Sequence, residues 1–141
     1  MASVIMHAFN QIQKAGGKKL FRSHNSDYKA GEQQRDFVDV KEVVDVCYFL
    51  MHHRKDSAIY NLGSGKARTF LDLVKATFAA LKVPENISFI DTPADIRDKY
   101  QYFTEADMNK LKSVGFEQPF HELEDGVRDY VSQYLKENKY Y

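Results

Sequence analysis

The stretch AIYNLGSGKARTFLDLV, residues 58–74, has the residue types and spacing of a phosphate-binding turn. A short apolar run leads into Gly63-Ser64-Gly65, two basic residues follow, and a helical pattern begins at Thr69. Many phosphate sites consist of a strand, a glycine turn and a helix, because the N–H groups of the turn and of the helix N-terminus face the anion. A nucleotide site at this turn is the first hypothesis that the sequence raises.

The detailed spacing departs from the known phosphate motifs. A dinucleotide fingerprint has a third glycine three positions after the second, where this chain has Arg68. A phosphate loop has Ser or Thr directly after Gly-Lys, whereas Ala67 follows Lys66. Thr69 and Asp72 have the spacing of a capping box, which explains the turn as the start of a helix. The sequence favours this structural interpretation, and a direct phosphate site is the alternative.

The histidines and tyrosines form no recognisable catalytic or metal-binding motif. His52 and His53 are adjacent in sequence and cannot share a helix face, and His7, His24 and His121 are scattered. No tyrosine is followed by a lysine four residues later, so no Tyr-x-x-x-Lys pair is present. We therefore expect surface or hydrogen-bonded histidines and no metal site.

A polar loop over residues 23–34 is the second candidate site. Its length without any periodicity is unusual in a compact domain, and such loops often carry function. Phe21 and Arg22 precede the loop, and Arg35 follows it. An aromatic face beside guanidinium groups suits a stacked base and a diphosphate, because Arg offers a planar fork to phosphate oxygens. An ordinary solvated loop is the alternative.

Helical and strand patterns alternate along the chain. The strand patterns cover residues 18–22, 35–40, 58–62 and 87–91. The helical patterns cover residues 2–15 and 41–53, the stretch from Thr69 to before Pro84, the stretch from Thr104 to Gly115, and residues 121–137. Residues 92–99 are expected to form a loop. This order predicts an α/β fold class with at least partly parallel pairing.

Composition favours one domain over residues 1–141, with 43% hydrophobic residues available for a core. The formal net charge is zero, which argues against a nucleic-acid or membrane partner on electrostatic grounds. Cys47 is the single cysteine and lies in an apolar helical pattern, so we expect a buried thiol and no intrachain disulfide. No apolar run is long enough to span a bilayer, and we expect a soluble, cytoplasmic protein.

Several segments together resemble the C-terminal part of the ADP-L-glycero-D-manno-heptose 6-epimerases, which are extended short-chain dehydrogenase/reductases of the NAD-dependent epimerase/dehydratase family. In order, these segments are MASVIMHAFNQ, KLF, RDFVDVKEVVDV, IYNLGSGKARTF and DKYQYFTEADMNKLKSVGF. The RDFV and YNLGSG segments are typical of sugar-nucleotide epimerases and dehydratases in general. The pattern Y-Q-x-F-T-x-A-D is what resembles the heptose enzymes.

The resemblance implies a substrate-binding portion without the N-terminal Rossmann half. Residues 35–62 would pack on that nucleotide-binding domain in the complete enzyme. The complete enzyme would be an isomerase and a homo-oligomer, in which NADP oxidises and then reduces C6 of the heptose. The chain alone would hold no cofactor, contain no catalytic or metal-binding residue and be inactive.

The resemblance also implies a set of contacts to ADP-heptose or a related ADP-sugar. Phe21 would lie at the base, Arg35 at the diphosphate, Tyr100 beside it, and His7 would be the substrate histidine of the first helix. The loop residues Arg22, Ser23 and His24 would continue the base and ribose contact. Two alternatives remain, a stand-alone nucleotide-sugar-binding module and an interaction or complementation fragment without catalysis.

Overall fold

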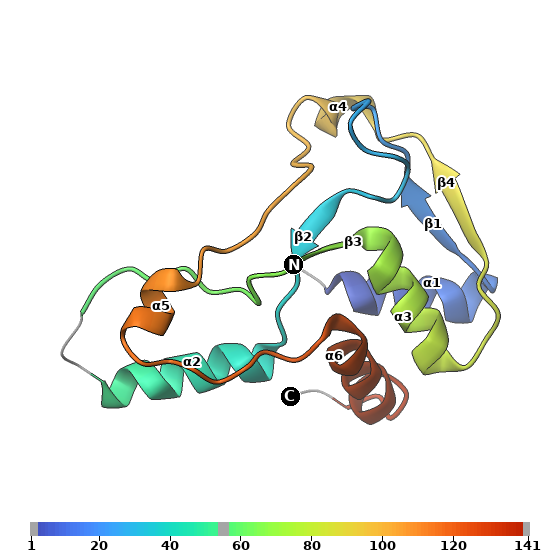
Figure 1. Cartoon of the computed structure of the whole chain (residues 1–141). Helices are drawn as coiled ribbons and strands as arrows, with labels where there is room; N and C mark the ends of the chain where they lie inside the picture. Colours follow the sequence, from blue (N-terminus) through green and yellow to red (C-terminus); the bar gives the residue numbers. More distant parts are fainter. Residues whose placement is uncertain (1–2, 54–56, 140–141) are drawn as a thin grey trace.

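The larger of the two hydrophobic cores is built on a parallel pair of short strands. Strand β1 (Lys18–Phe21) pairs with β4 (Ile87–Ile90), so that two segments far apart in the sequence lie side by side (Figure 1). In this register Lys18 is opposite Ile87 and Phe21 is opposite Ile90. The parallel pairing and the α/β class expected from the sequence are confirmed. The structure is a computed structural model that describes residues 3–53 and 57–139.

Three helices pack around this strand pair. Helices α1 (Val4–Ala15) and α3 (Phe70–Leu81) pack against each other and both contact β1, and α6 (Leu123–Asp129) packs on α3. Their apolar faces therefore meet in one core. The buried members of this core are Ala8, Ile12, Leu20, Leu73, Val74, Ala76, Phe78, Leu81, Val127 and Val131.

Local sequence signals set the helix ends. The Thr69 hydroxyl accepts from the N–H of Asp72 at 2.9 Å, and the Asp72 carboxylate accepts from the N–H of Thr69 at 3.2 Å, which is the expected capping box of α3. Gly16 ends α1 with a φ of 64°, a value that glycine adopts without strain. Beyond α6 the helix widens over Tyr130–Leu135, where the N–H of Lys136 donates to a carbonyl five residues back at 3.0 Å.

A smaller core lies at the other end of the molecule, between α2 (Val40–His52) and α5 (Asn109–Ser113) (Figure 1). Asp39 caps α2 by accepting from the N–H of Lys41 at 2.8 Å. The core consists of the buried residues Val46, Met108, Leu111 and Phe116. Because α2 buries only this one side, its other apolar residues remain in solvent.

An antiparallel strand pair connects the two cores. Strand β2 (Gln34–Asp36) leads toward α2, and β3 (Ala67–Thr69) leads directly into α3. Arg35 of β2 is opposite Arg68 of β3. Both strands lie near the middle of the molecule in Figure 1. The pair therefore determines how the two cores are placed relative to each other.

Two strand predictions are wrong: one expected strand does not form, and another ends earlier than expected. Residues 58–62 lie within the described part of the chain and form no strand, and the strand expected over 35–40 ends at Asp36. A strand requires a hydrogen-bonded neighbour, and the partner of β2 is only the three-residue β3. An apolar pattern alone does not supply that neighbour.

Three further expectations need correction. The helix expected from Thr104 begins only at Asn109, and the loop expected over 92–99 contains the short helix α4 (Ala94–Arg97). Cys47 is exposed instead of buried, because α2 turns Val46 and not Cys47 toward the smaller core. In residues 3–53 and 57–139, no helix has the length and apolar character needed to cross a membrane.

Replacing Phe78 tests the assignment of the larger core. Phe78 is completely buried in α3, so Phe78→Ala should lower the free energy of unfolding by about 3–5 kcal/mol, measured by urea denaturation. Phe103→Ala is the matched control, because Phe103 is 50% exposed and should change this free energy by less than about 0.5 kcal/mol. Equal losses for the two variants would contradict the assignment.

Candidate functional site

The Gly-Ser-Gly turn is organised around the carboxylate of Asp36. Oδ1 of Asp36 accepts hydrogen bonds from the backbone N–H of Ser64 at 2.7 Å and from its hydroxyl at 2.6 Å. Oδ2 accepts from the N–H of Gly65 at 2.9 Å and of Ala106 at 3.0 Å. These are the donors that a phosphate-binding turn would offer to an anion. They are already paired with an anion of the chain itself.

The two glycines are required by this arrangement. A side chain at Gly63 would collide with the Asp36 carboxylate and lie 2.8 Å from the Cβ of Ala106, and Gly65 has a φ of 71°. Partial burial raises the pKa of Asp36, but the hydrogen bonds from Ser64, Ala106 and Gly65 outweigh it and hold the pKa below its ordinary value. The turn is a structural joint, as the capping-box interpretation predicts. Its donors do not fit a dinucleotide diphosphate.

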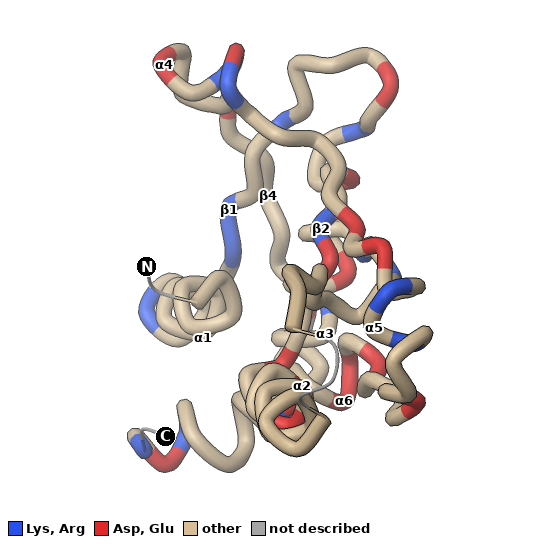
Figure 2. Tube along the Cα trace, turned by 90° about the vertical axis from the view of Figure 1, so that its left-hand side faces the viewer, with Lys and Arg blue, Asp and Glu red and all other residues tan. Residues whose placement is uncertain are grey.

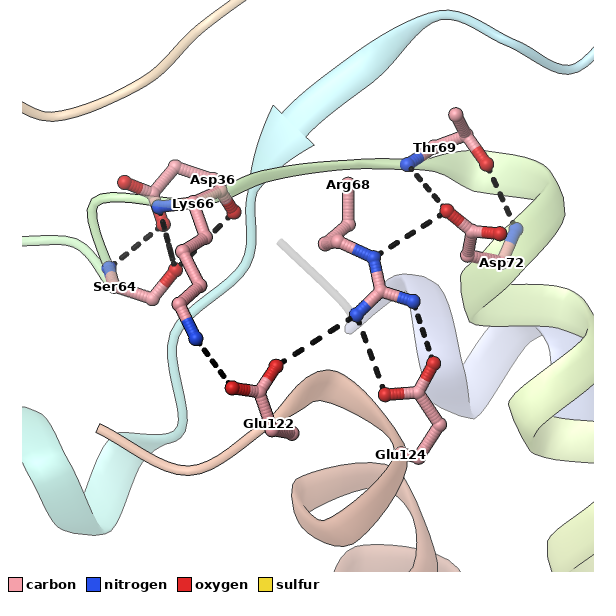
Figure 3. Close-up of polar contacts among 8 residues, drawn as sticks. All are labelled: Asp36, Ser64, Lys66, Arg68, Thr69, Asp72, Glu122 and Glu124. Carbon is pink, nitrogen blue, oxygen red and sulfur yellow. Dashed lines mark hydrogen bonds and ion pairs between the residues drawn. The ribbon is translucent and has the colours of Figure 1, made fainter. Parts of the chain in front are cut away.

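The basic residues beside the turn are also paired within the chain. The Lys66 ammonium forms an ion pair with Glu122, and the Arg68 guanidinium contacts Asp72 at 3.4 Å and Glu124 at 2.5 Å (Figure 3). Their positive charges are therefore compensated by carboxylates at the start of α3 and at the start of α6. Neither residue needs an external anion.

A separate cavity of about 440 Å³ lies beside β1 and contains two of the residues that the resemblance selects. Phe21 and Tyr100 both line it, and their ring centroids are 6.4 Å apart in an edge-to-face arrangement. The remaining lining residues are Val4, Gln11, Lys18, Lys19, Leu20, Gly31, Gln33, Phe70 and Ile90. The strand β1 is basic over much of its length in Figure 2. Aromatic walls next to a basic strand suit a ligand with a ring and an anionic part.

Arg35 lies next to this cavity without a carboxylate partner. Its guanidinium carbon is 5.8 Å from the ring centroids of both Phe70 and Tyr100. Nη1 donates to the carbonyl of Gln34 at 2.7 Å, and Nη2 donates to the carbonyl of Gln101. Among the described residues no acidic side chain forms an ion pair with Arg35, and its other N–H donors form no hydrogen bond. Two aromatic faces and two carbonyls hold the positive charge in place and leave it available to an anion.

Tyr100 is placed as a neutral hydrogen-bond donor. Burial raises the pKa of its phenol above the ordinary value, and the nearby charge of Arg35 opposes this shift only in part. At neutral pH the hydroxyl keeps its proton. It can therefore donate to a phosphate or sugar oxygen without adding negative charge.

The other four residues selected from the sequence lie outside the cavity wall. His7 is exposed on α1, between Val4 and Gln11, which do line the cavity one turn before and one turn after it. Arg22 is 4.0 Å from Asp91 in an exposed ion pair. Ser23 and His24 belong to the following loop. The Ser23 hydroxyl donates to the Asn25 carbonyl at 2.7 Å, and the N–H of His24 donates to Tyr102 at 3.2 Å.

The sequence reasoning missed most of the residues in and around the cavity wall, and three of them are polar or aromatic residues with notable contacts or burial. Gln33 is only 2% exposed and lines the cavity, although it lies in a stretch that reads as a solvated loop. Lys18 also lines the cavity, and burial lowers its pKa. Tyr102 contacts the loop from a distant segment. Of these residues, only Lys18 could have been found from a local pattern, namely the alternation of side chains along β1.

The histidines behave as expected from their spacing. His52 and His53 each place Nδ1 at 2.8 Å from the carbonyl four residues earlier in α2. Within residues 3–53 and 57–139, no group of three or more His, Cys, Asp or Glu side chains could hold a metal ion. His121 lies 3.0 Å from the buried carboxylate of Glu42, so it also has a structural contact.

The pKa of Asp36 provides a test of the joint. Because its folded-state pKa is lowered, the charged carboxylate stabilises the fold above the ordinary carboxyl pKa, and this contribution is lost as pH falls through the folded-state value. Asp36→Asn should lower the free energy of unfolding by about 2 kcal/mol at pH 7, and the loss should shrink below about pH 4. Asp98→Asn, at an exposed position without a side-chain hydrogen bond among the described residues, is the control. A pH-independent difference between wild type and Asp36→Asn would contradict this role.

Curated relatives match nearly the whole sequence, and a family model matches its first part. Residues 1–63 match the NAD dependent epimerase/dehydratase family. The chain is 47% identical to the ADP-L-glycero-D-manno-heptose-6-epimerase of Fusobacterium nucleatum over 147 aligned positions, covering 99% of this chain and 44% of that protein. It is 48% identical over 135 positions to the enzyme of the same name from Nitratidesulfovibrio vulgaris, covering 96% and 42%. The chain thus spans less than half the length of these relatives.

Solved structures match the fold. The ADP-L-glycero-D-manno-heptose-6-epimerase of Helicobacter pylori superposes with a TM-score of 0.75 at 24% identity, over 94% of this chain and 38% of that one. A UDP-N-acetylglucosamine 4-epimerase from Methanobrevibacter ruminantium gives a TM-score of 0.76 at 20% identity, over 96% and 40%. From the family model and the two curated relatives at 47% and 48% identity, the chain belongs to the NAD-dependent epimerase/dehydratase family and corresponds to the C-terminal part of the heptose 6-epimerases that it resembles.

Proposed function

We propose that this chain is the ADP-sugar-binding part of an NADP-dependent ADP-glyceromanno-heptose 6-epimerase. The observation that carries the proposal is the position of Arg35, an unpaired cation beside a cavity walled by Phe21 and Tyr100. The substrate class is supported by the two relatives at 47% and 48% identity, which are named as heptose 6-epimerases. The choice of NADP rests on the resemblance to those enzymes.

The proposed contacts follow from the chemistry of each side chain. The Phe21 ring offers an apolar face to adenine, and the Arg35 guanidinium offers charge-assisted hydrogen bonds to the diphosphate. The Tyr100 hydroxyl donates to a phosphate oxygen. A cavity of about 440 Å³ is within the size range of small-molecule sites. Fixing the ADP end in this way would orient the sugar for the reaction.

The remaining proposed contacts lie around the cavity. His7 would approach the ligand from the exposed side of α1, next to Gln11. Arg22, Ser23 and His24 would contact the base or the ribose from the loop that begins after Phe21. These four assignments rest on the resemblance, since none of the residues forms part of the cavity wall.

The redox part of the reaction is proposed to come from another part of the enzyme. When bound, NADP would supply the oxidation and the reduction at C6. The described residues offer no turn for its diphosphate, because Asp36 occupies the Gly-Ser-Gly donors. The sequence contains no Tyr-x-x-x-Lys pair. The chain alone is therefore proposed to bind the substrate without converting it, in a cytoplasmic enzyme that is a homo-oligomer.

Residues 35–62 are proposed to pack on the nucleotide-binding domain of the complete enzyme. This segment contains α2, whose outer side exposes several large apolar residues, including Val44 at 59% and Tyr48 at 65% exposure. Exposed apolar patches of this kind mark interaction surfaces. A stand-alone nucleotide-sugar-binding module, the first alternative, would use the same cavity. An interaction fragment, the second alternative, would use the same surface. The two experiments below separate these alternatives.

Replacing Arg35 tests the ligand site. Because a charge-assisted contact to the diphosphate would be lost, Arg35→Ala should raise the Kd for ADP about tenfold, measured by isothermal titration calorimetry. Arg128→Ala is the control, since Arg128 is exposed on α6 and pairs with Asp125. An unchanged Kd in Arg35→Ala would rule out the diphosphate contact. Epimerase activity of the purified wild-type chain would show that the chain needs no other redox part.

Replacing residues on the outer side of α2 tests the packing of segment 35–62. The nucleotide-binding half of the Fusobacterium relative, supplied as a separate polypeptide, should bind the wild-type chain in analytical ultracentrifugation. Because burying a carboxylate in an apolar interface is unfavourable, Val44→Asp should weaken this association at least about tenfold. Val83→Asp, which changes another exposed valine after α3, should leave it intact. Failure of the wild-type chain to associate would contradict the proposed surface.

A further inference from the structure

The loop over residues 22–33 begins and ends at the cavity wall. Phe21, directly before it, and both Gly31 and Gln33 near its end line the cavity wall. The hydrogen bonds inside the loop are local, such as the N–H of Asp27 to the side chain of Asn25 at 2.9 Å. Local bonds of this type form turns but do not attach a loop to the rest of a molecule. The position of the loop must therefore depend on other contacts.

One residue from a distant segment contacts the start and the middle of this loop and the residue that directly follows it. The Tyr102 hydroxyl accepts from the N–H of His24 at 3.2 Å, and its ring lies 5.3 Å from that of Tyr28 at an interplanar angle of 30°. The Tyr102 carbonyl accepts from the N–H of Gln34 at 2.8 Å. Three independent contacts thus converge on one side chain and its backbone.

The tip of the loop depends on Tyr102 in particular. The loop start is held by Arg22, whose N–H donates to Ile90 at 2.8 Å, and its end by Gly31, whose carbonyl accepts from Leu71 at 3.0 Å. Among the described residues, every hydrogen bond and ring contact from residues 24–28 to residues outside the 22–33 loop ends on Tyr102.

Tyr102 also contacts the ligand site itself. Its ring centroid lies 5.4 Å from that of Tyr100, at 68°, and Tyr100 in turn lies 6.4 Å from Phe21. Arg35 is placed over the Tyr100 ring at 5.8 Å. Four aromatic rings therefore run without interruption from Tyr28 in the loop to Phe21 in the cavity wall. A displacement of Tyr102 would therefore alter ring packing at both ends of this series, at Tyr28 and at Phe21.

We propose that Tyr102 is a positioning residue that holds the 22–33 loop in the conformation that binds the ADP end of the substrate. This inference rests on the proposed function for the identity of the ligand. Tyr102 itself does not line the cavity and acts through Tyr100 and through the loop. Its loop-holding role is visible without any ligand, so it can be judged separately from ADP binding.

The test compares Tyr102→Ala and Tyr102→Phe in the 141-residue chain. Tyr102→Ala removes the rings' contacts and the hydroxyl acceptor and should raise the Kd for ADP about tenfold. Tyr102→Phe keeps the ring and removes only the acceptor, so its Kd should rise about threefold. In the free protein, amide hydrogen exchange at residues 24–28 should become faster in Tyr102→Ala, while the amides of α3 remain as protected as in wild type.

Three controls make the outcomes decisive. Phe103→Ala removes a neighbouring, half-exposed ring and should change neither the Kd nor the loop exchange. Tyr28→Ala combined with Tyr102→Ala should lose less affinity than the sum of the single changes, because both act through one contact. Unchanged loop exchange in Tyr102→Ala, or additive losses, would overturn the positioning role. If wild type does not bind ADP while the loop exchange responds as expected, the proposed ligand is wrong and the loop-holding role stands.

Discussion

The fold and the candidate site both depend on the hydrogen bonds accepted by Asp36. Its carboxylate ties β2 to the Gly-Ser-Gly turn and to the segment at Ala106, so three distant parts of the chain are fixed at one point. Successive strand residues point to opposite sides. With Asp36 directed to the turn, Arg35 is directed to the other side, where Tyr100 and the cavity lie. The joint that connects the two cores therefore also orients the cation of the site.

The ion pairs near this joint contribute less to the free energy of unfolding than their number suggests. The Lys66–Glu122 pair is more than half exposed on both sides, and exposed pairs are typically worth less than about 1 kcal/mol. Arg68 is better placed, because its side chain is only 29% exposed and its guanidinium meets carboxylates from two helices. These contacts attach α6 to the start of α3 (Figure 3). The hydrogen bonds that Asp36 accepts at the turn are partly buried, so leaving their donors unpaired would cost more than breaking an exposed ion pair.

The sequence predicts the features that rest on local signals and misses those that rest on distant partners. The capping box at Thr69 involves only residues that are neighbours in sequence, and it is confirmed. The cavity brings Phe21 and Tyr100 together from opposite halves of the chain, and only the resemblance to a family indicated that pair. Gln33 and Tyr102 carry no local signal, because burial and ring contacts arise from tertiary packing alone.

The failed strand over residues 58–62 and the exposed side of α2 lie in the same segment of the chain, residues 35–62. In both, one apolar face packs on the smaller core, with Tyr60 and Leu62 in the first, and apolar residues outside that face stay exposed. Ile59 is 89% exposed, although the residues that follow it alternate between partly buried and exposed, as in a strand. Without a neighbouring strand, the backbone N–H groups of an extended segment are left to bond to water. The apolar pattern alone therefore does not produce a strand. A nucleotide-binding domain packed on this segment, as proposed above, would cover both Ile59 and the exposed apolar side of α2, so one partner would explain both departures from expectation.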